Sequence, residues 1–266
     1  MTIRKTLFGA ASVAALALAV TAAPAAADGT YVESTAAPAA SDAREFAWSI
    51  TVGGTSDYIF RGLSLSNEDP AAQGSIDFSY GIFYAGAWAS NVSDYTSDNL
   101  YGPWELDLYA GVKPVWGPVT FDFGVIGYLY PAADDSGEYI EFKAAGAMEI
   151  FKGLNGNVQF FYTPDQENYS EGYTIEGNLA YGLPQVGIFA PTITGGIGYT
   201  EADAAGFFGP SDNYTYWNAG LVVGVEKFVF DFRYWDTDLD SSGGPGEIYT
   251  GLDDERFVFT AKVTLP

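Results

Sequence analysis

The sequence predicts an all-β protein: a transmembrane antiparallel up-and-down β-barrel of about 12 strands, with short periplasmic turns and longer acidic extracellular loops. Three observations predict it. Apolar and polar residues alternate through most of the chain after residue 44, as in strands that have one apolar and one polar face. Most alternating runs are 9–14 residues long, close to the roughly 9–11 residues with which a tilted strand crosses a bilayer. Short connections alternate with long ones, as in outer-membrane barrels.

The alternating runs follow one another along the chain and define the expected strands. In the fifth run, for example, Phe121 and Phe123 lie on one face and Asp122 and Gly124 on the other. The predicted strands span 45–61, 71–80, 82–91, 103–113, 117–130, 138–151, 155–163, 172–181, 187–200, 213–225, 226–235 and 255–265.

The connections divide into short turns and long loops. The turns are Gly81, Pro114–Trp116, Lys152–Leu154, Gly182–Val186 and Glu226–Lys227. The loops, across 62–70, 92–102, 131–138, 164–171, 201–213 and 236–255, hold 20 Asp and Glu and no Lys or Arg. The extracellular face is therefore predicted to be anionic. Aromatic residues near the strand ends, such as Tyr128 and Tyr199, are typical of interfacial girdles.

The N-terminus reads as an export signal. Residues 1–27 combine a basic start, Arg4 and Lys5, with an apolar run of about 14 residues, too short for a spanning helix, and a small-residue cleavage site before Asp28. Residues 28–43 are small and polar and predict a flexible leader, which leaves 44–266 as the barrel. The expected location is the outer membrane of a Gram-negative bacterium. The expected partners are the barrel-assembly machinery during insertion, outer-membrane lipid and lipopolysaccharide.

Composition excludes several functions. A formal charge of −23 excludes nucleic-acid binding through phosphate neutralisation. The chain has no His and no Cys, which excludes a Ser-His triad, a Cys nucleophile and the usual zinc sites. Glu105 and Asp107 share a strand face, but this spacing is generic on an alternating strand. We therefore predict no enzymatic activity and no catalytic residues.

The polar faces of the predicted strands carry ionisable side chains that would face the lumen. These side chains can line a pore and set its charge selectivity, or they can form a buried ion-pair network that fills a narrow barrel. The acid excess predicts a preference for cations if the lumen conducts. The predicted lumen charges are Asp57, Arg61, Asp77, Glu105, Asp107, Asp122, Glu141, Lys143, Asp231 and Arg233, with Gln73, Lys113, Gln159, Glu176 and Lys262 on the same faces.

The last long loop contains a calcium-like pattern. Asp236, Asp238, Asp240 and Glu247 match positions 1, 3, 5 and 12 of a calcium-binding loop. Position 6 is Ser241 rather than Gly, and strands flank the loop instead of helices. A solvated acidic loop explains the pattern as well, so calcium is the one candidate ligand and no other cofactor is expected.

The region of about 53–131 resembles the TorF family of porins. The residues that carry the resemblance are Gly54, Ser56, Asp57, Tyr58, Phe60, Arg61, Gly62, Gln73, Gly74, Trp88, Asn91, Glu105 and Tyr109. The resemblance implies an outer-membrane barrel with a porin role.

Two functions follow from these observations. The first is a passive diffusion channel for small solutes, with cation preference. The second is a non-conducting structural or surface-interaction barrel whose acidic loops bind a partner or divalent ions. A loop folded inward, or a lumen closed by a network around Arg61, favours the second function.

Overall fold

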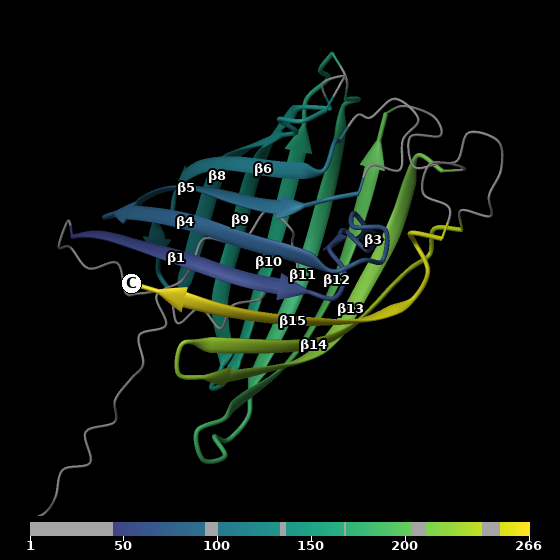
Figure 1. Ribbon diagram of the computed structural model, residues 1–266. Helices are drawn as coiled ribbons and strands as arrows, with labels where there is room; N and C mark the ends of the chain where they lie inside the picture. The colour runs from purple at the N-terminus through teal and green to yellow at the C-terminus, as the bar shows by residue number, and fades with distance from the viewer. Residues whose placement is uncertain (1–44, 94–100, 134–136, 168, 204–210, 241–250) are drawn as a thin grey trace, which may run out of the picture.

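Twelve long strands form one closed antiparallel sheet in the computed structural model, which describes residues 45–93, 101–133, 137–167, 169–203, 211–240 and 251–266 (Figure 1). Each strand pairs with its neighbours in the chain, and the pairing of the first strand with the last closes the barrel. The barrel strands are β1 (Phe46–Thr55), β4 (Ala71–Tyr80), β5 (Phe83–Asn91), β6 (Trp104–Val112), β8 (Val119–Leu129), β9 (Tyr139–Phe151), β10 (Leu154–Thr163), β11 (Gly172–Gly182), β12 (Ala190–Ala202), β13 (Asn213–Val225), β14 (Phe228–Thr237) and β15 (Arg256–Leu265). Three two-residue strands are β2 (Ile59–Phe60), β3 (Leu63–Ser64) and β7 (Val115–Trp116).

The predicted fold class and strand count are confirmed. β4 and β13 have the predicted bounds, and the alternation that defined the runs reflects two different environments on the two faces of each strand. Along β10, Val158 and Phe160 are exposed on the outer surface, whereas Gln159 and Phe161 are buried in the interior. No helix among the described residues is long and apolar enough to cross a membrane.

The first predicted strand, 45–61, is wrong at its end. β1 stops at Thr55. The backbone N–H of Ser56 still bonds the carbonyl of Phe259 on β15, but the Thr55 hydroxyl then bonds the carbonyl of Asp57 at 2.7 Å. From there the chain turns into the barrel. Asp57 and Arg61 therefore belong to a connection between β1 and β4 instead of to a strand face. We call residues 56–69 the inner loop, and the end of the barrel that carries the long connections the outer end.

Tyrosine rings and glycines share the interior of the barrel wall. The Tyr84 ring lies over Gly111 and Gly124, and the Tyr216 ring lies over Gly198, where an added Cβ would overlap the ring. Glycine on the inner face lets these rings lie flat against the neighbouring strand, which leaves their hydroxyl groups free to bond inward.

The predicted domain division lies partly outside the described residues. The signal segment 1–27 and the leader 28–43 fall outside them, and both stay predictions.

Candidate functional site: the lumen and its inner loop

The inner loop lies inside the barrel at its outer end, where β2 and β3 form a small hairpin (Figure 1). The two turn residues, Arg61 and Gly62, have φ values of 52° and 85°, the positive values that a two-residue type I′ hairpin turn requires. A Cβ on Gly62 would also lie 2.6 Å from Cγ2 of Thr237 and 2.7 Å from Cβ of Tyr216. Only glycine therefore fits where the hairpin tip meets the barrel wall.

Arg61 crosses from the hairpin tip to the barrel wall. Its guanidinium donates two hydrogen bonds to the carboxylate of Glu141 on β9, at 3.0 and 2.8 Å. The same carboxylate accepts bonds from the Tyr128 hydroxyl at 2.9 Å and the Thr163 hydroxyl at 2.8 Å. Glu141 is 1% exposed. A buried carboxylate with four donors is fully satisfied, and the two-pronged geometry holds Arg61 in one orientation.

Aromatic rings flank the Arg61 guanidinium. Its central carbon lies 4.6 Å from the centroid of the Phe60 ring and 5.2 Å from that of the Phe161 ring. Ring faces at these distances attract a cation electrostatically. The ion pair and the rings together hold a non-glycine residue at positive φ, a conformation that L side chains adopt at a cost.

Asp57 organises the inner loop and ties it to β15. Its carboxylate accepts bonds from Ser64 at 2.6 Å, Ser66 at 2.8 Å and Arg256 at 3.0 Å. The Ser64 backbone N–H also bonds the carbonyl of Leu252 at 2.9 Å. The loop is thus fixed at its base by Asp57 and at its tip by Arg61.

Glu105 on β6 anchors Tyr58 of the inner loop. Its carboxylate accepts a bond from the Tyr58 hydroxyl at 3.0 Å and one from the Tyr130 hydroxyl at 3.4 Å. The Tyr58 ring packs on Trp88 with centroids 5.3 Å apart. These residues of the family resemblance therefore meet in one contact, although Tyr58 and Glu105 are 47 positions apart.

A second level of charges lies deeper in the lumen. Asp122 on β8 accepts bonds from Lys143 at 3.1 Å and Tyr84 at 2.6 Å, and Lys113 lies 4.0 Å away. On the β14 wall, Arg233 bonds Asp231 at 2.9 Å and Thr194 at 3.0 Å. This level pairs acids with bases instead of leaving a ring of acid.

All the predicted lumen charges lie on the inner side of the barrel, but in different settings. Asp57 and Arg61 belong to the inner loop. Glu105 and Glu141 lie on the wall and accept hydrogen bonds from the loop. Asp77 accepts a hydrogen bond from the Tyr109 hydroxyl. Asp107, Gln159 and Glu176 are buried in the interior. Among the remaining residues of the resemblance, Asn91 accepts the Ala72 N–H at 2.6 Å, Ser56 bonds Phe259, and Gly54, Gln73 and Gly74 lie in the β1–β4 pairing.

The sequence reasoning missed several residues of this site. Tyr128, Phe161 and Thr163 complete the surroundings of Arg61, and Arg256 holds Asp57. Placing Tyr128 in an interfacial girdle was wrong, because its side chain is 1% exposed and lies inside the barrel. Tyr128 and Arg256 stood on the polar face of their predicted strands, so alternation could have found them as lumen residues. Their partners were hidden, because these depend on the inner loop turning into the barrel.

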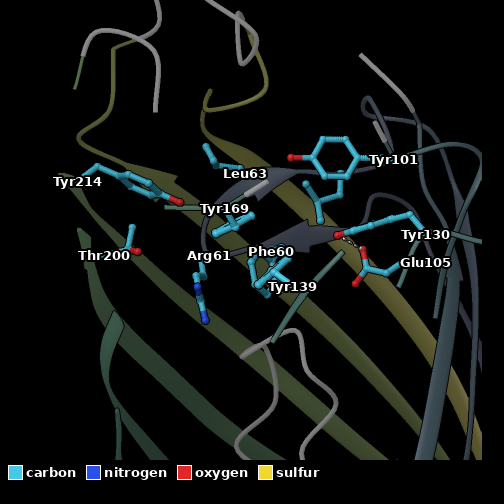
Figure 2. Close-up of a pocket in the computed structure, with 11 residues that line it drawn as sticks. Phe60, Arg61, Leu63, Tyr101, Glu105, Tyr130, Tyr139, Tyr169, Thr200 and Tyr214 are labelled. Carbon is cyan, nitrogen blue, oxygen red and sulfur yellow. Dashed lines mark hydrogen bonds between the residues drawn. The ribbon is translucent and has the colours of Figure 1, made fainter. Parts of the chain in front are cut away.

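A cavity of about 50 Å³ lies between the inner loop and the wall. Figure 2 shows its lining, which includes Tyr101, Tyr130, Tyr139, Tyr169 and Tyr214 around Glu105 and Arg61. Burial raises the pKa of Tyr169, so its hydroxyl stays protonated. A cavity of this size holds a few water molecules and no larger solute.

The structure describes only part of the predicted calcium loop. Asp238 accepts the Thr215 backbone N–H at 2.6 Å, and Asp236 accepts the Tyr234 hydroxyl at 3.0 Å. Asp240 is exposed, and Glu247 lies outside the described residues. Within the described ranges, no group of three acidic side chains is placed to hold a metal ion. Calcium at this loop stays a prediction.

The closed sheet, the apolar outer surface and the polar interior define a β-barrel of the outer-membrane type. Residues 38–265 match the family described as "Bacterial protein of unknown function (Gcw_chp)", and the chain belongs to that family. The TorF name is not carried by this match and stays a resemblance. No curated protein matches the chain.

Several solved outer-membrane structures resemble this chain, and the likeness to the NanC porin supports the fold. The NanC porin has 11% sequence identity and a TM-score of 0.52, with 83% of this chain and 100% of that chain covered. LpxR from Salmonella typhimurium has 9% identity and a TM-score of 0.46, with 82% and 99% covered. The outer membrane channel DcaP of Acinetobacter baumannii has 10% identity and a TM-score of 0.41, with 83% and 97% covered. At 11% identity the likeness to the NanC porin extends to the fold alone.

Proposed function

We propose that this protein is an outer-membrane diffusion channel for small polar solutes that prefers cations, and that its outer entrance is constricted by the inner loop. The observation that carries the proposal is a closed barrel whose inner face bears ionisable side chains at two levels, around Glu141 and around Asp122. A barrel that only filled its interior for stability would gain more from apolar packing than from buried ion pairs.

Cation preference rests on charge. The predicted loop ranges hold 20 Asp and Glu. The structure adds one base, Arg61 of the inner loop, which is paired with Glu141. The outer end therefore has a large excess of acid, which concentrates cations at the entrance. The proposal includes three further points. Residues 1–27 direct export, the barrel contacts lipopolysaccharide in the outer membrane, and the loop after β14 holds calcium. We expect no catalysis, since a chain without His or Cys lacks the common general base and thiol nucleophile.

A specific observation favours the second function, a non-conducting barrel that acts through its surface. Tyr58, Ile59 and Leu63 of the inner loop are 1%, 3% and 4% exposed, so the loop packs tightly in the outer end of the lumen. The two functions share one structure and differ in whether ions pass.

The refolded full chain in planar lipid bilayers separates the two functions. We expect discrete conductance steps and, under a potassium chloride gradient, a reversal potential that corresponds to a permeability ratio for potassium over chloride of about 3 or more. A membrane that contains inserted barrels, verified by gel mobility without heating, and that stays silent would establish the non-conducting barrel.

A further inference from the structure

The guanidinium of Arg61 occupies a site that the barrel wall builds. The site consists of Glu141 on β9, Phe161 and Thr163 on β10, and Tyr128 on β8. None of these residues belongs to the inner loop, so the site would persist if the loop left the barrel. Figure 2 shows Arg61 extending from the loop with its nitrogen atoms directed away from the other labelled side chains.

The chemistry of this site fits one class of ligand. Two parallel N–H···O bonds at 3.0 and 2.8 Å match the planar edge of a guanidinium. The Phe161 ring, with its centroid 5.2 Å from the guanidinium carbon, supplies an aromatic face for the delocalised cation. A spherical inorganic cation would use the carboxylate but gain less from the ring and from the second hydrogen bond.

Besides Arg61, Phe60 of the inner loop touches this site, since its ring packs edge-on against Tyr128 with centroids 5.9 Å apart. The polar contacts of the loop lie elsewhere. Asp57 binds Arg256, and Tyr58 binds Glu105, each on another part of the wall. Among the described residues, Arg61 is thus the one ion-pair partner of Glu141. If Arg61 withdrew, Glu141 would lose its ion-pair partner. Lys143 also lies by the Phe161 ring, 5.9 Å from its centroid, but its ammonium is bonded to Asp122. A buried carboxylate that has lost its partner costs free energy until another cation binds it.

We propose that this wall site binds solutes with an alkylguanidinium group, and that Arg61 is a tethered competitor that occupies the site when no such solute is present. Binding of the solute displaces Arg61 and frees the tip of the inner loop, which opens the constriction. The inference rests on the proposed function for its second half, since opening matters only in a channel. Occupation of the site by solute is independent of conduction.

The test uses the Arg61→Ala variant of the full chain, refolded in detergent and titrated with ethylguanidinium chloride. Arg61→Ala empties the site, so we expect a saturable rise of its melting temperature with half-saturation on the order of 1 mM, the range of a single charge-assisted contact. Sodium chloride at equal concentration should not reproduce the rise. The wild type should need at least about tenfold more ligand, because its own Arg61 competes at high effective concentration.

Two double variants locate the binding. Adding Glu141→Gln to Arg61→Ala should abolish the response. Adding Glu176→Gln, which changes another buried wall carboxylate bonded to Gln159 and Tyr216, should leave it intact. An equal response in both double variants, or no saturation in Arg61→Ala, would overturn the inference.

A second measurement covers the case in which Arg61→Ala does not refold. In wild-type bilayers, ethylguanidinium should raise the open fraction at least about threefold over tetramethylammonium, which has no N–H donors. No difference between the two cations would contradict the inference. Saturable binding to a barrel that never conducts would refute the proposed channel and leave the site standing.

Discussion

Replacing Glu141 with Gln should detach the inner loop. The variant leaves the Arg61 guanidinium buried without its carboxylate, and breaking a buried pair in this way costs as much as about 4 kcal/mol. The loop can avoid part of this cost by moving Arg61 into water. We therefore expect a lower free energy of unfolding in urea together with exposure of the hairpin tip.

Limited trypsin digestion reports that exposure directly. Arg61 is 8% exposed in the native barrel, so the bond between Arg61 and Gly62 should resist cleavage in the wild type. It should be cut rapidly in Glu141→Gln. The matched control is Glu176→Gln, a substitution of a carboxylate that is also buried but bonds Tyr216 instead of the inner loop. Equal protection of Arg61 in wild type and Glu141→Gln would show that the ion pair does not hold the loop.

A charge placed midway along the outer surface should be nearly as damaging. Phe232 lies in the middle of β14, is 51% exposed, and faces outward beside Phe259. If lipid covers this surface, Phe232→Arg should cost about 2–4 kcal/mol, the penalty for arginine at the bilayer midplane of a barrel. Refolding into phospholipid vesicles at graded urea concentrations measures it.

The control for this substitution lies near the strand end. Phe257, the second residue of β15, is 81% exposed, and Phe257→Arg should cost about 0–1 kcal/mol, because arginine there reaches the polar interface. Equal costs at the two positions would contradict a membrane around the barrel, since water or a protein partner imposes no such dependence on depth.

The barrel wall could be predicted from the sequence, because the polarity of each wall residue matches the lipid or the lumen that its side chain faces. Phe121 and Phe123 face outward and Asp122 faces inward whatever the neighbouring strands are, so alternation alone assigns them. The same property explains why strand bounds such as 71–80 and 213–225 agree with β4 and β13.

The inner loop could not be predicted in this way. Asp57 and Arg61 fall on the polar parity of β1 and Tyr58 and Phe60 on the apolar parity, because a hairpin with one face toward the wall has the same period as a strand. The turn at Arg61 and Gly62 lacks the Asn-Gly or Asp-Gly pair that marks a type I′ turn most strongly. The decisive contact joins Arg61 to Glu141, 80 positions later, and no local pattern encodes such a pairing.

The sequence predicted which charged side chains face the lumen, but not which of them pair with each other. Asp122, Lys143, Asp231 and Arg233 stood on the polar faces, and the structure sorts them into the β8–β9 pair and the β14 pair. The register of β8 against β9, with Asp122 opposite Ala145, brings Lys143 within reach of Asp122. Register is a property of the whole sheet, so it lies beyond what one run of alternating residues determines.

An ion pair between Arg61 and Glu141 joins the inner loop to the wall, and in the proposed channel it keeps the outer entrance constricted. Single-channel conductance of Arg61→Glu, Glu141→Arg and the doubly exchanged protein tests it most directly. Like charges at the two positions should expel the loop and raise the conductance of each single variant at least about threefold, and the double exchange should restore the wild-type value. Single variants that conduct like the wild type, or a double exchange as open as the singles, would contradict the claim.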